Sequence, residues 1–375
     1  MTSYQALGIR PVINANATLT RLGGSLMPPE VVAAMAEAAR SFVDLDELQR
    51  KVGERIAELT RNEAAYVSSG AAAGLVLATA ACVAGTDPDA VHQLPSLDGL
   101  KCEIIVQKLH RNGYDHAVRQ VGVDLIEIGN STATTRSDLL TALSEKTAGI
   151  FWFQGAMNRP GELPLEEVIE VAKAHGIPVV VDAAAQLPPV SNLWGFTHMG
   201  ADLALFSGGK DLRGPQATGL ILGRRTLIEC CRVHGNPNHA IGRPMKVGKE
   251  EMFGLLAAVE RYVKLDHQAR ANECERIVTM WNETLSDIDG VVAKRDFPNE
   301  AGQPLPRSLV LVDSETAGIT HDRIIDELAH GEPAISVAPA GPGGLYLNPM
   351  TLEPGEAETV RDRLLEILSS KVVPR

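Results

Sequence analysis

The sequence has no long apolar run and no concentration of positive charge. Its longest apolar stretch, residues 71–84, is interrupted by Gly74 and Thr79 and is too short and too rich in alanine to span a bilayer. Lysine and arginine are scattered along the chain, and the net charge is 35 − 47 = −12. Broad affinity for phosphate backbones is not expected of such a chain, so we expect neither a membrane partner nor a nucleic-acid partner.

Cysteines are few and dispersed. The five of them are Cys82, Cys102, Cys230, Cys231 and Cys274, and no CxxC pair occurs with a matching second pair. A structural zinc site is therefore not expected, and we predict no metal. The N-terminus lacks a basic region followed by an apolar run, which excludes a signal peptide of the usual kind. These features are typical of a cytoplasmic protein with reduced thiols.

Short apolar segments alternate with helical patterns over the first two thirds of the chain. The expected strands cover residues 64–67, 103–107, 124–128, 149–153, 177–182, 201–206 and 217–222. This alternation predicts an α/β fold with a mainly parallel sheet covered by helices. Ligands in such sheets bind beyond the carboxyl ends of the strands, so residues at those ends are the candidates for chemistry.

The pattern also suggests three parts. We predict an N-terminal arm over residues 1–27, a large domain over 28–270, and a smaller C-terminal α+β domain over 271–375. A long helical pattern covers residues 249 to about 285, and short strands mixed with helices follow it.

Lys210 is the most informative residue of the chain. It follows the apolar segment 201–206 on a turn made of Gly208 and Gly209. An amine that is shielded from water loses proton affinity, and an unprotonated lysine forms a Schiff base with an aldehyde. Asp182 ends the preceding strand. A strand-end lysine for the aldehyde and a strand-end aspartate for the pyridinium nitrogen are the two protein groups that pyridoxal phosphate requires.

A turn rich in small residues follows the strand at 64–67. Ser68, Ser69, Gly70 and Ala71 place hydroxyls and backbone N–H groups at the start of a helix, which is a suitable cup for a phosphate. An ordinary serine cap with a glycine turn is the alternative. Ser207, three residues before Lys210, could bind the same phosphate or could simply form the turn.

Two other strand ends carry candidates. His110 follows the strand at 103–107, where its flat ring could stack on a pyridine ring; a surface histidine is the alternative. After Asp182, the small residues 183–185 leave room for a ring against the backbone, so Ala184 and Gln186 are further cofactor-binding candidates. We predict Lys210, Asp182 and His110 as the catalytic residues.

Cations after the lysine could hold a substrate carboxylate or phosphate. Arg213 and Arg243 are the strongest candidates, because Arg213 lies three residues after Lys210 and Arg243 lies in a Gly-Arg-Pro loop. Asn16 and Arg21 in the N-terminal arm could also reach an active site, in this subunit or a neighbouring one. Solvated surface charge is the alternative for each cation.

The segment FSGGKDLRGPQATG, residues 206–219, resembles the lysine segment of the selenocysteine synthase (seryl-tRNA selenium transferase) family of fold type I pyridoxal phosphate enzymes. The segment RPMKVGK at 243–249 is similar to the one that follows in that family, and PVINA at 11–15 and LGGS at 22–25 resemble its N-terminal motif. The resemblance implies an aspartate aminotransferase-like fold, with Lys210 as the Schiff-base lysine and Asp182 as the partner of the pyridine nitrogen. It also implies a phosphate shell made of Ser69, Gly70, Ala71 and Ser207.

Two departures from the family bear on the substrate. The selenium transferases carry an additional N-terminal domain that binds tRNA, whereas this chain starts almost at the N-terminal motif, and the chain is acidic. It looks closer to short members such as D-glucosaminate-6-phosphate ammonia-lyase. The resemblance therefore implies a lyase that releases ammonia from a small hydroxylated amino acid or amino sugar acid, acting as a homodimer or a larger homo-oligomer. Racemisation or epimerisation, aldol cleavage, selenium transfer and a non-catalytic role are the alternatives.

Overall fold

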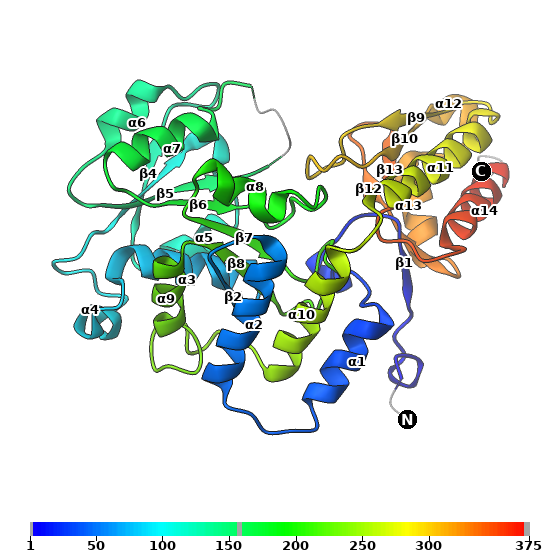
Figure 1. The fold of residues 1–375 in the computed structure, drawn as a ribbon. Coiled ribbons are helices and arrows are strands. Elements are labelled where there is room, and N and C mark those ends of the chain that lie inside the picture. Colours follow the sequence, from blue (N-terminus) through cyan, green and yellow to red (C-terminus); the bar gives the residue numbers. More distant parts are fainter. Residues whose placement is uncertain (1–2, 156–159, 371–375) are drawn as a thin grey trace. The chain divides into compact units, whose positions relative to one another are not determined.

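The computed structural model describes residues 3–155 and 160–370 of the chain. Its contacts divide the chain into two compact units (Figure 1). One comprises residues 25–265, and the other comprises residues 1–24 together with 266–375. The boundaries predicted from the sequence, after residues 27 and 270, stay predictions. The contacts group the N-terminal segment with the C-terminal residues rather than leaving it as a separate arm.

A single mixed sheet organises the larger unit. Its strand order is β2-β8-β7-β6-β5-β3-β4. The strands are β2 (Ala64–Ser68), β3 (Glu103–Gln107), β4 (Asp124–Ile128), β5 (Thr147–Phe153), β6 (Val179–Asp182), β7 (Leu203–Ser207) and β8 (Gly219–Gly223). β8 is antiparallel to both of its neighbours, and the other neighbouring pairs are parallel. This confirms the predicted α/β class with a mainly parallel sheet.

Helices cover both faces of this sheet. On one face the core includes residues of α2 (Leu45–Thr60), α6 (Arg136–Ala142), α7 (Leu165–Ala174), α8 (Asn192–Met199) and α10 (Lys249–Tyr262). On the other it includes residues of α3 (Ala71–Ala84), α4 (Pro88–Gln93), α5 (Asp115–Arg119) and α9 (Arg225–His234). The remaining helix of this unit, α1 (Pro29–Ala38), packs against α10. The result is a three-layer α/β/α arrangement.

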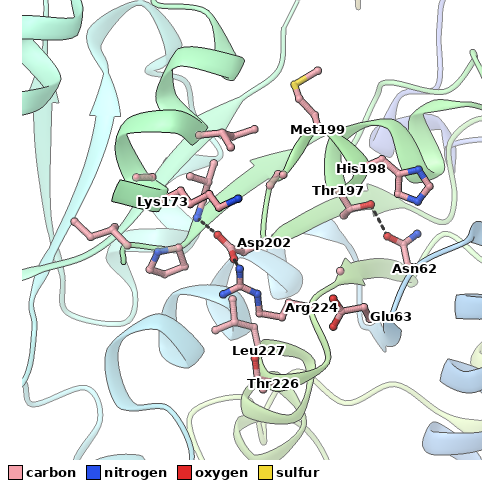
Figure 2. A pocket seen from close by; sticks show the side chains of 18 of the residues that line it. Asn62, Glu63, Lys173, Thr197, His198, Met199, Asp202, Arg224, Thr226 and Leu227 are labelled. Carbon is pink, nitrogen blue, oxygen red and sulfur yellow. Dashed lines mark hydrogen bonds and ion pairs between the residues drawn. The ribbon is translucent and has the colours of Figure 1, made fainter. Parts of the chain in front are cut away.

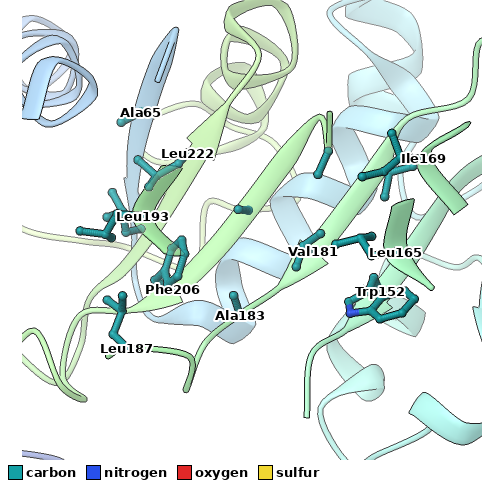
Figure 3. Close-up of a cluster of buried hydrophobic side chains, with 14 of the residues drawn as sticks. Ala65, Trp152, Leu165, Ile169, Val181, Ala183, Leu187, Leu193, Phe206 and Leu222 are labelled. Atoms are coloured by element: carbon teal, nitrogen blue, oxygen red, sulfur yellow. The ribbon is translucent and has the colours of Figure 1, made fainter. Parts of the chain in front are cut away.

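The strand residues alternate between these two cores, except in β5, where Ala148 and Ile150 belong to different cores beside an irregularity in the pairing with β3. In β7, Leu203 and Leu205 belong to the α3 face, whereas Ala204 and Phe206 belong to the opposite face. Figure 3 shows part of that opposite core, with Phe206 among its labelled side chains. Since both faces are covered, the central strands β5 to β8 are largely apolar. Burying each such Leu or Phe side chain contributes about 1.5–3 kcal/mol. The same alternation fixes the face on which each strand-end residue lies.

The second unit is built on a smaller antiparallel sheet of order β12-β13-β10-β9. Its elements are β9 (Val291–Asp296), β10 (Arg307–Val312), β12 (Ala338–Pro339), β13 (Gly344–Leu347), α11 (His267–Ser286), α12 (Ser314–Ala317), α13 (His321–His330) and α14 (Glu356–Ser369). The N-terminal strand β1 (Val12–Asn14) pairs in parallel with β11 (Ala334–Ser336). This pairing is why residues 1–24 belong to the C-terminal unit.

The long helix predicted over 249–285 is wrong. The structure has two helices there, with α10 ending at Tyr262 and α11 beginning at His267. Asp266 is the N-cap of α11, and its side chain accepts a hydrogen bond of 2.8 Å from the backbone N–H of Ala269. A cap of this kind marks the start of a new helix, so the single predicted helix is divided at this point. No helix within the described part of the chain is both long and apolar enough to cross a membrane.

Candidate active site

Three residues from three strands form a row at one edge of the large sheet. Gly219, the first residue of β8, pairs with Ser68 of β2 on one side and with Ser207 of β7 on the other. By the alternation of the strands, all three lie on the α3 face, as does Asp182 at the end of β6. The sheet therefore brings the predicted residues Ser68, Ser207 and Asp182 to one edge and one face.

The N-terminus of α3 closes against this row. A Cβ atom on Gly219 would lie only 2.3 Å from the backbone carbon of Gly70 and 2.6 Å from the backbone nitrogen of Ala71. Only glycine permits this approach. Gly70 is the N-cap of the helix at φ +99°, and no described side chain caps the first turn. The first N–H groups of α3 are thus available to an anion, which the helix dipole also favours.

The three serines near this turn differ in exposure. Ser68 is 2% exposed, and its hydroxyl donates a hydrogen bond of 2.9 Å to the carbonyl of Gly70. The buried Ser68 side chain therefore stabilises the turn from within the protein. Ser69 and Ser207 are half-buried, and Ala72 in the first turn of α3 is exposed, so the cup is open to a ligand. Ser69 and Ser207 are accordingly better placed than Ser68 to touch a phosphate.

Asp182 has an unusual electrostatic environment. Burial raises the pKa of its carboxyl above the ordinary value, while the N–H of Ala184 and the charge of Lys210 act to lower it. The Ala184 N–H donates to Asp182 Oδ1 at 3.0 Å. The influence of Lys210 means that the two predicted catalytic groups lie within electrostatic range of each other. A carboxylate kept in such a place can hold a proton on a neighbouring ring nitrogen.

The loop that carries Lys210 is closed on itself by backbone hydrogen bonds. The N–H of Gly208 donates to the carbonyl of Thr218 at 2.9 Å, and the N–H of Gly214 donates to the carbonyl of Gly208 at 2.8 Å. A Cβ on Gly208 would lie 2.0 Å from Thr218 Oγ1, and one on Gly209 would lie 2.5 Å from the Cα of Gln216. Both glycines are therefore required by close packing, which holds the half-buried Lys210 in a defined place.

These features fit pyridoxal phosphate. The close approach of Gly219 holds the α3 turn against the strand ends, and the uncapped N–H groups of that turn suit a phosphate. Asp182 and Lys210 would supply the acceptor for the ring nitrogen and the amine for the aldehyde. The donor set thus matches the three polar parts of this cofactor.

His110 lies in a different environment. It ends the short 3-10 helix Lys108–His110 and is 0% exposed. Its Nε2 lies 3.0 Å from Glu162 Oε2, and its ring packs edge-on against Trp152 with centroids 4.5 Å apart. Trp152 belongs to the core on the face opposite α3. Stacking of His110 on a cofactor would require these neighbours to move, and that role stays a prediction.

The two candidates after Asp182 both have partners in the chain. Ala184 donates to Asp182, and its carbonyl accepts the N–H of Ser207 at 3.2 Å, so this residue joins β6 to the start of the lysine loop. Gln186 is 4% exposed, and its Nε2 donates to the carbonyl of Gly155 at 3.3 Å. Ala184 borders the site directly, whereas Gln186 fixes the segment that follows β5.

The predicted arginines lie on two loops of the same unit. Arg213 adopts a left-handed backbone conformation with φ +57°, and its Nε donates to the carbonyl of Leu26 at 2.7 Å. Arg243 is exposed, with its Nη1 3.4 Å from Asn236 Oδ1. Their role in binding substrate stays a prediction.

Asn16 and Arg21 belong to the other unit. Asn16 is 9% exposed, and its Nδ2 donates to the carbonyl of Val337 at 3.0 Å, so it ties the N-terminal segment to the strand region at β11. Arg21 is exposed in a short 3-10 helix, Thr20–Leu22. The substrate-binding role of these two residues stays a prediction.

A cavity of about 630 Å³ lies at the opposite edge of the sheet, where β6 begins and β8 ends (Figure 2). Its polar side chains bind one another. Arg224 forms an ion pair with Asp202 at 2.6 Å, and the Thr197 hydroxyl donates to Asn62 Oδ1 at 2.6 Å. Asp202 Oδ2 also accepts the N–H of Val179 at 2.7 Å. This cavity lies away from the carboxyl ends of the strands and contains none of the predicted site residues.

Sequence reasoning missed Gly219 and the residues beneath the lysine loop. Gly219 has no chemical group to attract attention, and its importance arises from its pairing with two distant strands. Asp211, next to Lys210, is 3% exposed and accepts a hydrogen bond of 2.6 Å from the hydroxyl of Tyr262. The position of Asp211 directly after the lysine was a signal that could have identified it.

Comparison with known proteins places the chain among characterised enzymes. The family model of L-seryl-tRNA selenium transferase matches residues 12–293. A 5'-C-glycyluridine monooxygenase-decarboxylase from Streptomyces sp is 36% identical, over 97% of this chain and 92% of the relative. D-Glucosaminate-6-phosphate ammonia lyase from Salmonella typhimurium is 34% identical, over 97% of each chain.

Solved structures agree with the fold. A structure of D-glucosaminate-6-phosphate ammonia-lyase has a TM-score of 0.86 at 34% identity and covers 98% of this chain and 99% of its own. Serine palmitoyltransferase from S. paucimobilis, with a TM-score of 0.59 at 14% identity over 95% of this chain and 86% of its own, shares the fold alone. These matches confirm the predicted fold type I architecture.

Proposed function

This chain belongs to the L-seryl-tRNA selenium transferase family, and from that premise we propose that it is a pyridoxal phosphate-dependent lyase that releases ammonia from a small hydroxylated amino acid. The best-supported substrate class is a phosphorylated amino sugar acid, since a relative 34% identical over nearly its whole length is a D-glucosaminate-6-phosphate ammonia lyase. The observation that carries the proposal is the shared position of Asp182, Lys210 and the α3 cup on one face and one edge of the sheet.

The proposed reaction needs no external oxidant or reductant. The α-proton and the β-hydroxyl leave the substrate as water. Their loss creates a carbon–carbon double bond next to the amine. The resulting enamine takes up water and releases ammonia, so that the products are a 2-oxo acid and ammonia. The demanding step is removal of the α-proton, because it leaves electrons on carbon.

Pyridoxal phosphate, when bound, supplies an aldehyde that joins an amine and a ring that accepts those electrons. Within the chain, the half-buried carboxylate of Asp182 would keep a proton on the ring nitrogen. Lys210 Nζ would hold the aldehyde and, as a free amine, would take the α-proton as general base. The N–H groups at the start of α3 and the hydroxyls of Ser69 and Ser207 would hold the phosphate. His110, Ala184 and Gln186 remain proposed members of the same site.

The proposal is tested with the purified protein, pyridoxal phosphate and a phosphorylated 2-amino-3-hydroxy sugar acid. We expect ammonia and a 2-oxo acid in equal amounts, and borohydride should fix the cofactor to Lys210 in a form that peptide mass spectrometry identifies. Lys210→Ala should abolish both results. Lys173→Ala is the matched control, because Lys173 lines the cavity at the opposite sheet edge. If borohydride still fixed the cofactor to the Lys210→Ala protein as it does to the wild type, the assignment of Lys210 would be refuted.

The relative from Streptomyces supports a second candidate, oxidative decarboxylation of an amino acid. That reaction would consume oxygen and release carbon dioxide, whereas elimination does neither. Measuring oxygen uptake and carbon dioxide beside ammonia therefore separates the two candidates. Exchange of deuterium into Cα without ammonia release would indicate racemisation or epimerisation, and an aldehyde product would indicate aldol cleavage. Binding of tRNA at low salt would revive selenium transfer.

We also propose that the chain acts as a homodimer. Large apolar side chains are exposed around α1, with Leu26 62% exposed, Val32 47%, Phe42 103% and Val43 48%. Exposed apolar side chains of this size are typical of an interface, and a second copy of the chain would cover them. Light scattering of the purified protein tests this. Phe42→Glu should shift the mass toward that of a monomer, and a monomeric wild-type protein would contradict the proposal.

A further inference from the structure

The loop that carries Lys210 rests on one face of helix α10. A Cβ on Gly208 would lie 2.7 Å from Leu255 Cδ1, and one on Gly214 would lie 3.2 Å from the Cβ of Ala258. Leu255, Ala258 and Tyr262 are spaced three and four residues apart, so they share a face of the helix, and all three are 0% exposed. Helix α10 is therefore the floor beneath the lysine loop.

Tyr262 adds a polar contact to this floor. Its hydroxyl donates to Asp211 Oδ2 at 2.6 Å, and Asp211 follows Lys210 directly in the chain. Both side chains are buried, with Asp211 3% exposed. A short hydrogen bond to a carboxylate inside the protein is strong and directional. It fixes the residue next to the lysine relative to a rigid helix.

The backbone on both sides of Lys210 is fixed by the rest of the loop. The N–H of Ser25 donates to the carbonyl of Gly209 at 3.0 Å, and the N–H of Arg213 donates to the carbonyl of Lys210 at 2.9 Å. The hydrogen bond between Asp211 and Tyr262 adds a side-chain contact between this loop and α10. This contact therefore helps to fix the position of the loop on the helix, and with it the position of the Lys210 backbone.

From this geometry we infer that Tyr262 is a positioning residue for Lys210 and acts through Asp211. The inference rests on the proposed function, because it concerns the step in which Lys210 joins the cofactor. In that step the lysine nitrogen attacks the aldehyde carbon, the C=N bond forms, and the aldehyde oxygen leaves as water. The amine must lie on the correct side of the bound aldehyde, and a displacement on the order of 1 Å can slow such a step about a hundredfold.

The experiment follows formation of the C=N bond by absorbance after mixing the protein with saturating pyridoxal phosphate. We expect Tyr262→Phe to slow the bond-forming step about tenfold or more, since the amine is then less well oriented. Binding of the phosphate, measured with the non-reactive analogue pyridoxine phosphate, should remain close to that of the wild type. Tyr66→Phe is the matched control. It also removes a buried tyrosine hydroxyl, which lies on β2 near Asn236, and it should leave the rate unchanged.

A double-mutant cycle distinguishes positioning from simple packing. If Tyr262 acts through Asp211, then Asp211→Leu, which removes the acceptor at similar size, should also slow the step, and adding Tyr262→Phe to it should cause little further loss. Additive effects, or a normal rate in Tyr262→Phe, would overturn the inference. Circular dichroism verifies that each variant is folded, and Asp211→Leu tests the contact from the loop side if Tyr262→Phe does not fold. Failure of the wild type to attach the cofactor at Lys210 would instead refute the proposed function.

Discussion

A shielded aspartate lies at each of the two edges of the large sheet, and the two carboxylates differ in the partners that surround them. Burial raises the pKa of Asp182 at the end of β6 and also that of Asp202, which lies just before β7. Asp202 accepts the N–H of Val179 at 2.7 Å and pairs with Arg224 at 2.6 Å, so the chain itself compensates its charge. Asp182 accepts the N–H of Ala184 and feels the charge of Lys210.

The difference separates a structural carboxylate from one for which we propose a function. The partner of Asp202 is an arginine, which stays charged. The cation near Asp182 is a lysine whose proposed task requires it to lose its proton and bind an aldehyde. A protonated ring nitrogen would give Asp182 a charged partner that does not depend on that lysine. Perturbed carboxylates of this second kind are typical of functional sites.

The largest expected effect comes from changing each aspartate to its amide. Asp182→Asn should lower kcat/KM for ammonia release about a hundred- to a thousandfold, because an amide cannot stabilise the protonated ring nitrogen as a carboxylate does. Asp202→Asn should leave kcat within about twofold, since its edge has no contact with the proposed chemistry. Steady-state kinetics of both variants at saturating cofactor tests this comparison. A similar loss in both variants would remove the distinction between the edges.

The second prediction concerns the glycine at the centre of the functional edge. Gly219→Ala places a Cβ 2.3 Å from the backbone carbon of Gly70, so the first turn of α3 must shift. We expect pyridoxal phosphate to bind about tenfold more weakly or worse, a change of about 1.4 kcal/mol. Gly195→Ala is the matched control, because Gly195 lies in α8 with no atom within 4 Å of the added Cβ. Fluorescence titration measures both, and unchanged binding in Gly219→Ala would contradict the proposed phosphate cup.

The third prediction concerns the structural edge. Arg224→Ala leaves the carboxylate of Asp202, which is 6% exposed, without its ion-pair partner. The free energy of unfolding should fall by about 1–2 kcal/mol, a value at the lower end for a broken buried pair because the Arg224 side chain is 57% exposed. Urea denaturation measures the loss, and cofactor binding should not change. A variant as stable as the wild type would show that Asp202 does not depend on Arg224.

The sequence predicted the parts of this comparison that depend on local pattern. Asp182 and Lys210 could be identified because each follows a short apolar segment, and the α/β class followed from the alternation of such segments. Gly219 could not be identified in the same way, since its role depends on register with β2 and β7, which are far apart in the chain. The predicted helix over 249–285 failed because residues 263–266 contain neither glycine nor proline to mark the break. Asp202 resembled any other strand-flanking aspartate until its contacts with Val179 and Arg224 were known.

The smallest expected effect is on the pH dependence of stability without cofactor. The pKa of Asp182 is raised in the folded protein above its ordinary value of 3.8, so between those two values the folded state binds more protons than the unfolded state. The free energy of unfolding contributed by this group therefore falls as the pH rises through that window, and the loss persists at neutral pH. Asp182→Asn removes this contribution, so the cofactor-free variant should be at least as stable as the wild type at pH 7, with a flatter curve above pH 3.8.

Arg224→Ala should do the reverse at the other edge, because removing the cation that lowers the pKa of Asp202 makes the ionised form costlier. Its stability relative to the wild type should therefore decline as the pH rises. Thermal unfolding of the two variants and the wild type between pH 4 and pH 8 gives both differences in one experiment. Parallel curves for Asp182→Asn and the wild type would mean that burial of Asp182 carries no electrostatic cost. In that case its carboxylate would already be compensated within the chain, and the contrast between the two edges would disappear.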